Sequence, residues 1–517
     1  MLTATLLVVS SFIFLLYLFF KRKNEYWKSK GLITPKPWPI IGNYGDYLLI
    51  RKNLPDTVTA ICKQFPKEPM IGAYFGTEPV VIVKDPELLK LVVTKDFYYF
   101  SSRDLGAHTD REILVKNIFN ENGDKWRVLR QNLTPVFTSA KMKNMFYLIQ
   151  ERTKEFEKLL AKEIGFNPTH EVRCFMGRFT MDCIGSCIFG IATKVMSEEK
   201  NNPFRMMGET VTDFHPQRVL KMNVRNVWPN VYYLLGMRIF GDEVTNFFMN
   251  LIKGVFVSRN NTPGSRNDFI DFILGFKTNT CLTGDGIKSL KSGNDVNGKV
   301  SIPVDDEMLV AQTFVFFAAG FETSATTMNF TLYELSKHPE VLKRVQKEVD
   351  DYLVKTGGQV TFECISDLPY LEACVDEALR LYPVLGVLTR EVVEDYRMPS
   401  GLVLEKDTRV HIPVHYLHMH PDYFPEPEKY RPERFLGENK KNVKPFTYYP
   451  FGDGPRLCIG MRFARMQMMA GLVTVLRHYS VELPPGEPRT VEFNPLAFTI
   501  QTKHTIKLNF IPRKDTN

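Results

Sequence analysis

The chain has 517 residues, of which 44% are hydrophobic and 12% aromatic, enough to bury a large core. Its formal net charge of +8 is modest for this length, and no long basic run occurs, so the sequence predicts no nucleic-acid partner. The eight cysteines form no Cys-x-x-Cys pair, which argues against a zinc ribbon or a disulfide scaffold. Since there is also no internal repeat or long linker, we expect one large domain facing a reducing, cytosolic compartment.

The first 20 residues contain no charged side chain and are mostly Leu, Val, Phe and Ile. A helix of this length, at about 1.5 Å per residue, crosses roughly 30 Å of hydrocarbon. Lys21-Arg22-Lys23 follows at once, which predicts a signal anchor whose C-terminal side faces the cytosol. A cleaved signal peptide is the alternative, disfavoured because the N-region is uncharged and no Ala-x-Ala-like site precedes the basic cluster. Residues 21–43, basic and then proline-rich, are predicted to form a hinge.

The remainder, residues 44–517, is predicted to be mainly α-helical with small β-sheets. Helical periodicity is clear over residues 146–164, 304–336, 339–353 and 370–382. Strands and turns are indicated over residues 70–83 and 387–410. The segment 277–299 is rich in Gly, Asn, Ser, Thr and Lys, so we expect a mobile surface loop between helices there.

The longest expected helix carries the cluster Ala319-Gly-Phe-Glu-Thr-Ser324 among apolar residues. Gly320 is expected to weaken the helical hydrogen-bond ladder where an acid, Glu322, adjoins a hydroxyl, Thr323. Taken alone, a Thr inside an apolar helix most often bonds back to the carbonyl one turn earlier. A functional interpretation of the pair therefore depends on the motifs that follow.

Two later segments are ambiguous when taken alone. Glu377 and Arg380 are three residues apart, which places them on one helix face, but an exposed salt bridge would look the same. Four histidines within residues 411–420 could suggest zinc. Structural use is favoured instead, because Pro413 interrupts the helix that such a site needs and no carboxylate stands at metalloprotease spacing.

The most informative segment is Phe451-Gly-Asp-Gly-Pro-Arg-Leu-Cys-Ile-Gly460, which opens an apolar helix expected over residues 461–476. Its three glycines are expected to adopt positive φ and to let a flat ligand approach the backbone. The helix N-terminus should lower the pKa of Cys458, and Arg456 offers a fork for a carboxylate. A lone cysteine is usually a buried structural thiol, but these neighbours fill a core poorly and suit a metal-bound thiolate.

This loop matches, at every fixed position, the Phe-x-x-Gly-x-Arg-x-Cys-x-Gly signature of the haem-thiolate monooxygenases, the cytochrome P-450 family. The segment 319–324 resembles the family's oxygen-activating motif in the same way. The resemblance covers nearly the whole chain, and it is greatest to insect microsomal members associated with plant toxins and insecticides. It implies the cytochrome P-450 fold, with a single large haem domain behind an N-terminal transmembrane anchor.

The resemblance also implies roles for individual residues. Cys458 would be the proximal axial ligand of the iron in heme b (iron protoporphyrin IX). Thr323 would hydrogen-bond the oxygen being activated or a water beside it, and Glu322 would help to pass protons. Glu377, Arg380 and Arg434 would form a buried structural triad. Further cofactor contacts, mostly to the two propionates, are expected from Arg456, Trp126, Arg130, Arg103, Arg390 and Phe451.

By the same resemblance, the protein would be a monooxygenase of the endoplasmic reticulum membrane with its catalytic domain on the cytosolic face. It would take electrons from an NADPH-dependent flavoprotein reductase, with cytochrome b5 as an optional second donor, and insert one oxygen atom into lipophilic small molecules. Reductase docking is expected on a basic surface formed by Lys125, Arg127, Lys440, Lys441, Lys444 and Arg465. The substrate is expected to contact residues 103–119, 203–240, 314–318, 384–388 and 496–500.

Two other classes of protein remain as alternatives. A haem-thiolate isomerase or dehydratase would rearrange peroxides without a reductase, and a non-catalytic haem sensor would carry out no turnover. The Glu322-Thr323 pair argues against both, because neither needs an oxygen-activating proton relay. The sequence does not identify the substrate.

Overall fold

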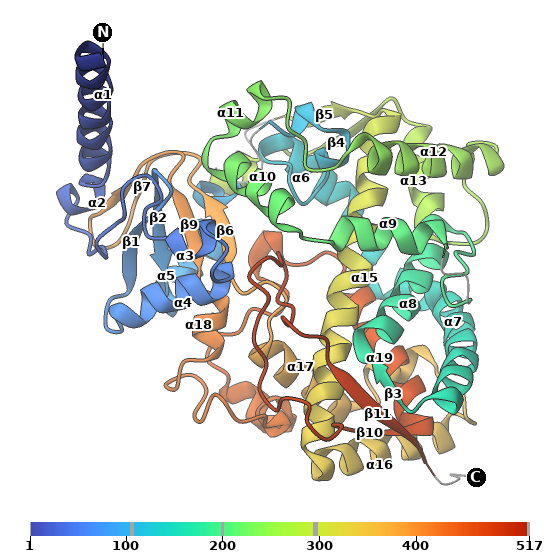
Figure 1. Ribbon diagram of the computed structural model, residues 1–517. Coiled ribbons are helices and arrows are strands. Elements are labelled where there is room, and N and C mark those ends of the chain that lie inside the picture. The colour runs from blue at the N-terminus through green and yellow to red at the C-terminus, as the bar shows by residue number, and fades with distance from the viewer. Residues whose placement is uncertain (1, 104–107, 198–200, 293–297, 514–517) are drawn as a thin grey trace.

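The computed structural model describes residues 2–103, 108–197, 201–292 and 298–513, and the side chains of only part of the first helix. The fold is mainly helical with small sheets, as expected. Figure 1 shows the helices gathered around one long central helix, with the largest sheet to one side of them, near the N-terminus. The expected residues 104–107 of the substrate-contacting loop lie outside the described part of the chain.

The central helix is α15 (Asp306–Lys337), whose first turn is capped by the Asp305 carboxylate accepting from the Met308 amide at 2.7 Å. Among the described residues it is the one helix long and apolar enough to cross a membrane, but 72% of its apolar window is buried inside the protein. A helix that is apolar on all sides is stable in a water-soluble domain only when other parts of the protein cover it. α15 is therefore the core helix of the fold.

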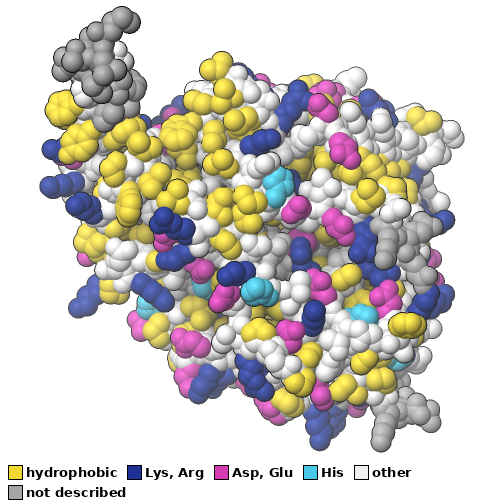
Figure 2. Space-filling view, viewed as in Figure 1, with side chains coloured by type: hydrophobic (Ala, Val, Ile, Leu, Met, Phe, Trp, Pro, Cys, Tyr) yellow, Lys and Arg dark blue, Asp and Glu magenta, His cyan; other side chains and the backbone are white. Residues whose placement is uncertain are grey.

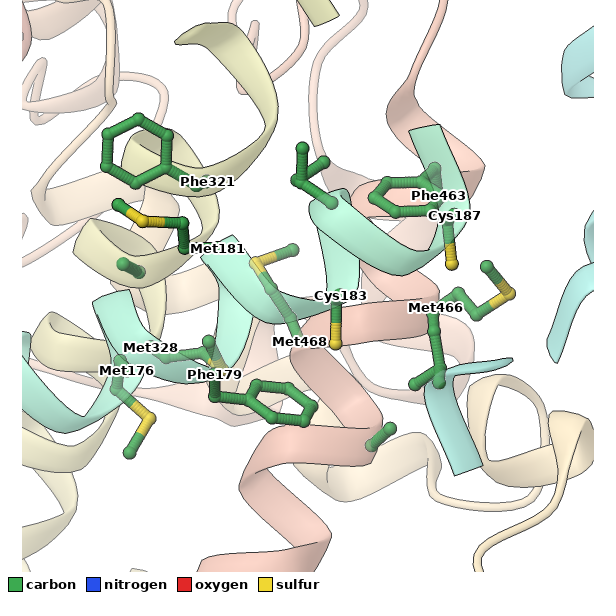
Figure 3. Close-up of a cluster of buried hydrophobic side chains, with 14 of the residues drawn as sticks. Met176, Phe179, Met181, Cys183, Cys187, Phe321, Met328, Phe463, Met466 and Met468 are labelled. Carbon is green, nitrogen blue, oxygen red and sulfur yellow. The ribbon is translucent and has the colours of Figure 1, made fainter. Parts of the chain in front are cut away.

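The helices packed around α15 bury many sulfur-containing side chains between them. Figure 3 shows Met176, Met181, Met328, Met466 and Met468 meeting between three of these helices, and methionine fills such irregular gaps well. The neighbours of α15 include α8 (Val172–Ile184), α16 (Pro339–Lys355), α17 (Pro369–Leu381) and α19 (Met461–His478), and α7 (Ser139–Phe166) packs on α8 and α19. The helices predicted from periodicity are thus confirmed, with boundaries within a few residues except at the start of α7.

The remaining helices lie around this core and beside the sheet. The longer ones are α4 (Leu54–Gln64), α6 (Gly123–Leu133), α9 (Pro203–Thr212), α10 (Pro216–Val227), α11 (Pro229–Leu234), α12 (Asp242–Ser258) and α13 (Phe269–Lys277). The short ones are α2 (Tyr26–Ser29), α3 (Gly45–Leu48), α5 (Pro86–Lys90), α14 (Ser289–Ser292) and α18 (Val414–His418).

The largest sheet has the strand order β1-β2-β9-β6 and forms a second hydrophobic core. Its pairs β1/β2 and β6/β9 are antiparallel, and β2/β9 is parallel. Its strands are β1 (Met70–Phe75), β2 (Glu78–Val83), β6 (Leu388–Glu391) and β9 (Arg409–Ile412). The smaller sheets use β3 (Thr169–Glu171), β10 (Tyr479–Glu482), β11 (Lys507–Pro512), β7 (Tyr396–Arg397) and β8 (Val403–Leu404). The strands predicted in residues 70–83 and 387–410 are confirmed.

One prediction was wrong. The segment 277–299, expected to be a surface loop, contributes β4 (Cys281–Gly284), which pairs with β5 (Val300–Pro303). Leu282 is buried while its neighbours are exposed. The Gln131 side chain of α6 accepts a hydrogen bond from the Asp285 amide at 2.7 Å and donates one to the Asp285 carboxylate at 2.9 Å. This long-range docking on α6 orders a segment whose composition alone indicates a loop. Residues 293–297 lie outside the described chain.

The N-terminal segment forms α1 (Leu2–Lys23), which projects away from the body of the protein in Figure 1. The residues after it turn back onto the sheet. Trp27 is fully buried, with its indole N–H donating to the Ala73 carbonyl at 2.9 Å, and Asn43 exchanges hydrogen bonds with Tyr74. The segment expected as a hinge is therefore held against β1 at both of these points.

Candidate active site

The cysteine loop is a tight turn that places Cys458 three residues before α19. Gly452 and Gly454 have φ of +74° and +64°, a conformation that costs side chains with a Cβ. A Cβ on Gly454 would lie 1.8 Å from the Val93 carbonyl oxygen, so the turn also presses against a neighbouring segment. Gly460 does not adopt the expected positive φ, since its φ is −89°. A Cβ at this position would meet no neighbouring atom.

Replacing Gly454 by Ala is expected to destabilise the loop. The positive φ alone costs about 1–3 kcal/mol in a non-glycine residue, and the clash with Val93 adds to it. We expect lower thermal stability and poorer haem retention. Gly177→Ala is the matched control, because Gly177 lies within α8, where an added Cβ would meet no neighbouring atom, and it should tolerate the change. An unchanged melting temperature for Gly454→Ala would contradict this description of the loop.

The Cys458 thiol is accessible to solvent, although protein atoms are packed densely around it. This burial raises the pKa of the thiol, and the Gly460 amide, Arg130 and Arg103 offset the effect only in part. The expected lowering of this pKa by the helix N-terminus was therefore wrong for the protein alone. A coordinating thiol is deprotonated by its metal, so the thiolate form depends on the cofactor more than on the helix dipole.

Arginine side chains converge beside this loop. Arg456 is buried, donates to the main-chain carbonyls of Ser101 and Glu121 and stacks on Trp126 at 4.1 Å, yet one of its terminal nitrogens has no partner among the described residues. Burial, and then the nearby charges of Arg103, Arg390 and Arg130, lower the pKa of Arg456 well below its usual value. The predicted cofactor-binding arginines are thus brought together by the fold.

Three arginines of this cluster form no ion pair with a described carboxylate, although Glu121 lies near enough to Arg456 to raise its pKa slightly. Within the described chain, no carboxylate lies within ion-pair distance of Arg130, Arg390 or Arg456. Burial lowers the pKa of Arg390 to about 10, and its Nε is unpartnered. Arg130 donates to the Leu457 carbonyl at 2.7 Å, directly beside the cysteine. Uncompensated buried cations are costly, so the cluster fits a ligand that brings acidic groups, as the two haem propionates would.

Two other predicted residues lie on the edge of this arrangement. Arg103 donates to the Phe119 carbonyl at 2.8 Å, and its guanidinium stacks on the Phe119 ring at 4.2 Å. Phe451 is partly buried, and its carbonyl accepts from the Cys458 amide at 2.9 Å. Phe451 therefore closes the loop through its backbone.

α15 presents a narrow accessible stripe in the middle of an otherwise buried stretch. Between residues 309 and 335, the positions that are not buried are Val315, Ala318, Ala319, Gly320 and Thr323. Apart from Gly320, these positions recur about one turn apart, so they share one face of the helix. Small side chains on that face leave room for a flat ligand and for a small molecule above it.

Thr323 adopts the geometry typical of a helical threonine, with its hydroxyl donating to the Ala319 carbonyl at 2.6 Å. The next two carbonyls also receive side-chain donors: Gln467 of α19 donates to Gly320 at 2.8 Å, and Thr180 of α8 donates to Phe321 at 3.0 Å. Three successive carbonyls are therefore drawn on by side chains, although α15 remains a continuous helix. These side-chain donors compete for the backbone carbonyls around Gly320, the position where the sequence predicted a weakened hydrogen-bond ladder.

Glu322 is buried, although it is next to Thr323 of the accessible stripe in sequence. Its Oε1 accepts from the Arg173 side chain at 2.7 Å, from Gln501 at 2.8 Å and from Thr326 at 3.2 Å. Burial raises the pKa of Glu322, while Arg173 acts in the opposite direction. Since the Arg173 side chain is 37% exposed, the acid is connected to the protein surface. Sequence spacing gave no sign of these partners, because Arg173 and Gln501 are far away along the chain.

The structural triad forms as predicted from resemblance. Glu377 and Arg380 are fully buried and make two hydrogen bonds of 2.8 Å, and Arg434 approaches the same carboxylate at 3.3 Å. Arg380 also donates to the His418 carbonyl, and the His418 ring receives the Tyr449 amide at 2.8 Å. Burial lowers the pKa of His418 to about 3, so it stays neutral. The triad thus supports the segment that leads into the cysteine loop.

Several residues of the expected docking surface are already in ion pairs, among them Lys440, whose ammonium lies 3.7 Å from the Asp376 carboxylate. Arg465 forms ion pairs with Asp376 at 2.8 Å and with Glu372 at 3.0 Å, and it is largely buried. Lys125 and Lys444 are exposed, and Lys441 pairs with the exposed Glu438. The basic character of this face therefore depends on the lysines and Arg127, with Arg465 holding the protein together.

An accessible thiol held in a glycine-rich turn, beside three buried or half-buried arginines (Arg130, Arg390 and Arg456) that form no ion pair with a described carboxylate, has the features of a haem-thiolate site. The comparisons with known proteins agree: the family model described as Cytochrome P450 matches residues 33–510. The chain belongs to the cytochrome P450 family. It is 35% identical to Cytochrome P450 6B2 of Helicoverpa armigera, over 99% of this chain and 98% of that protein.

Other relatives are similar over comparable lengths. Cytochrome P450 6k1 of Blattella germanica is 34% identical over 98% of this chain and 96% of its own length, and Cytochrome P450 6a2 of Drosophila melanogaster is 34% identical over 96% of each. The protein is therefore a cytochrome P450 monooxygenase whose cofactor is heme b. The accessible thiol, the converging arginines and the small-residue stripe on α15 fit that cofactor.

Proposed function

We propose that this monooxygenase uses Cys458 as the axial ligand of its haem, with Arg456, Arg130, Arg390, Arg103, Trp126 and Phe451 holding the cofactor. The observation that carries the assignment is the accessible Cys458 thiol beside Arg130, Arg390 and Arg456, which form no ion pair with a carboxylate of the described residues. When bound, heme b supplies the redox-active iron at which dioxygen is reduced. The protein then has to hold the substrate, exclude water and deliver protons.

In this proposal Glu322 and Thr323 deliver the protons. Water beside the partly exposed Arg173 would reprotonate Glu322, and burial raises the pKa of Glu322 toward the protonated form that can donate. Thr323 lies on the accessible stripe of α15, where its hydroxyl oxygen can accept a proton while donating its own. The proton would pass from Glu322 by way of water to the hydroxyl and then to the oxygen being reduced.

We place the protein in the endoplasmic reticulum membrane, with residues 1–20 as the anchor, residues 21–43 as the connecting segment and residues 44–517 as the cytosolic domain. Support comes from α1, which ends in Lys21-Arg22-Lys23, and from the hydrophobic side chains gathered beside it in Figure 2. Exposed apolar residues occur both near the N-terminus and on α10 and α11. They are Trp38, Ile40, Leu220, Trp228, Leu234 and Leu235. Such a surface suits contact with lipid and access for a lipophilic substrate.

The electron donor in this proposal is an NADPH-dependent flavoprotein reductase, with cytochrome b5 as an optional second donor. Reversing two exposed charges, Lys125→Glu and Lys444→Glu, should slow reductase-dependent turnover most at low salt, because screening is weakest there. Lys253→Glu on α12 is the control and should have no such effect. A turnover rate that is equally insensitive to salt in all variants would contradict docking on this face.

The function itself is tested with haem-loaded protein, NADPH, reductase and a panel of lipophilic compounds. A monooxygenase yields product only when the reductase is present. A peroxide isomerase or dehydratase would work without it, and a binding protein would form no product at all. Product formation independent of the reductase would therefore overturn the proposal.

A further inference from the structure

Arg218 is a buried cation whose side chain is not used up by the fold. It lies on α10, is only 9% exposed, and donates through one terminal nitrogen to the main-chain carbonyls of Thr210 at 2.7 Å and Asp213 at 3.1 Å. Its Nε is buried and has no hydrogen-bond partner among the described residues. No carboxylate of the described chain lies within ion-pair distance of it. One terminal nitrogen of the guanidinium thus caps the end of α9, whereas Nε has no partner among the described residues.

Aromatic rings connect Arg218 to the accessible face of α15. Its guanidinium lies over the rings of Phe240, at 5.2 Å, and Phe214, at 5.4 Å. Phe240 packs edge-to-face on Phe314 of α15, with centroids 5.0 Å apart. Phe314 is buried and precedes Ala318, at the edge of the accessible stripe, by one helical turn. Packed aromatic rings therefore connect the cation to the edge of the face that carries Thr323.

A second unsatisfied polar side chain lies on the same helix. Asn223 is 4% exposed, and neither its amide oxygen nor its amide nitrogen has a partner in the described part of the chain. Buried polar groups are normally hydrogen-bonded, so groups left unpaired call for an explanation. α10 is amphipathic, and Arg218 and Asn223 are among its buried side chains, whereas Leu220 is exposed. These groups therefore belong to its inward-facing side.

We propose that Arg218 is a specificity-determining residue that binds the carboxylate of a lipophilic acid, whose apolar chain extends along α15 toward Ala319 and Thr323. The inference rests on the proposed function, since it concerns the substrate of that site. Phe314 and Thr323 are nine residues apart, which is roughly 14 Å of helix at about 1.5 Å per residue. A medium-length fatty acid spans such a distance. A carboxylate would pair the leftover side of the guanidinium, and charge-assisted hydrogen bonds are the strong ones.

The test is equilibrium binding of dodecanoate and of methyl dodecanoate to the haem-loaded full chain, measured by calorimetry. The wild-type protein should bind the acid more tightly than the ester. Arg218→Gln should weaken acid binding about 10- to 100-fold and leave ester binding unchanged. Arg218→Lys keeps the charge and should retain most of the preference. Arg238→Gln is the control, because that arginine is exposed and paired with Asp242.

Equal affinity of the wild-type protein for acid and ester, or equal loss of both in Arg218→Gln, would overturn the inference, and the latter would indicate a purely structural cap of α9. The carbon-monoxide spectrum of each preparation is recorded in parallel. Absence of the thiolate band in the wild type would count against the proposed function, whereas the binding comparison decides the role of Arg218 in either case.

Discussion

Replacing Cys458 by Ser is expected to abolish the red-shifted carbon-monoxide band from which the family takes its name, together with turnover. The band depends on electron donation from a thiolate, and a serine hydroxyl is a far weaker donor. The thiol is accessible within the protein, so no rearrangement is needed for it to reach a metal. The measurement is the reduced carbon-monoxide difference spectrum with haem content assayed in the same sample.

Cys281→Ser is the matched control for this experiment. Cys281 is also an exposed thiol, but it lies on β4 and should leave both the spectrum and the activity unchanged. If Cys458→Ser kept the thiolate band and normal turnover, the assignment of the site would be wrong.

Removing the hydroxyl of Thr323 is expected to uncouple electron use from product formation. Thr323→Ala should bind haem and substrate almost normally, because the predicted cofactor contacts lie elsewhere. Proton delivery should suffer, and general acid catalysis contributes typically about 10²- to 10⁴-fold. Glu322→Gln keeps the shape of the acid but cannot donate its proton, so it should behave similarly. Electrons would then leave as hydrogen peroxide. The measurement is the ratio of product formed to NADPH consumed, with peroxide assayed in the same reaction.

Thr313→Ala provides a control on the same helix. The Thr313 hydroxyl bonds back to the Leu309 carbonyl at 2.9 Å, much as Thr323 bonds to Ala319, but Thr313 is fully buried and off the accessible stripe. It should lose the back-bond without losing coupling. Unchanged coupling in both Thr323→Ala and Glu322→Gln would leave Thr323 as an ordinary back-bonded helix residue.

The helices and strands were predictable where one face repeats with a clear period. α15, α16 and α17 follow from apolar spacing, and β1 and β2 from a β-rich run broken by Gly76 and Thr77. The β4/β5 pair was missed because a single buried Leu282 and contacts to α6 decide it, and neither leaves a periodic signal. Local composition predicts local structure, whereas docking onto a distant helix does not show in it.

In the candidate site, too, the features set by local motifs were predictable and those set by distant residues were not. Cys458 and the residues around it stand in contiguous motifs, so resemblance located them, and the structure brings the arginines together. The surroundings of Glu322 were not predictable, since its partners Arg173 and Gln501 are each about 150 residues or more away in sequence. The pKa of Cys458 was misjudged because the helix N-terminus is local, whereas burial is a property of the whole fold.

The protein is expected to insert one atom of dioxygen into an organic substrate with electrons from a reductase. The direct measurement is turnover under isotopically labelled dioxygen, with the first substrate that the compound panel identifies. We expect one labelled oxygen atom in the product, formed only when NADPH and reductase are both present. Product that lacks the label, or that forms without the reductase, would contradict the claim.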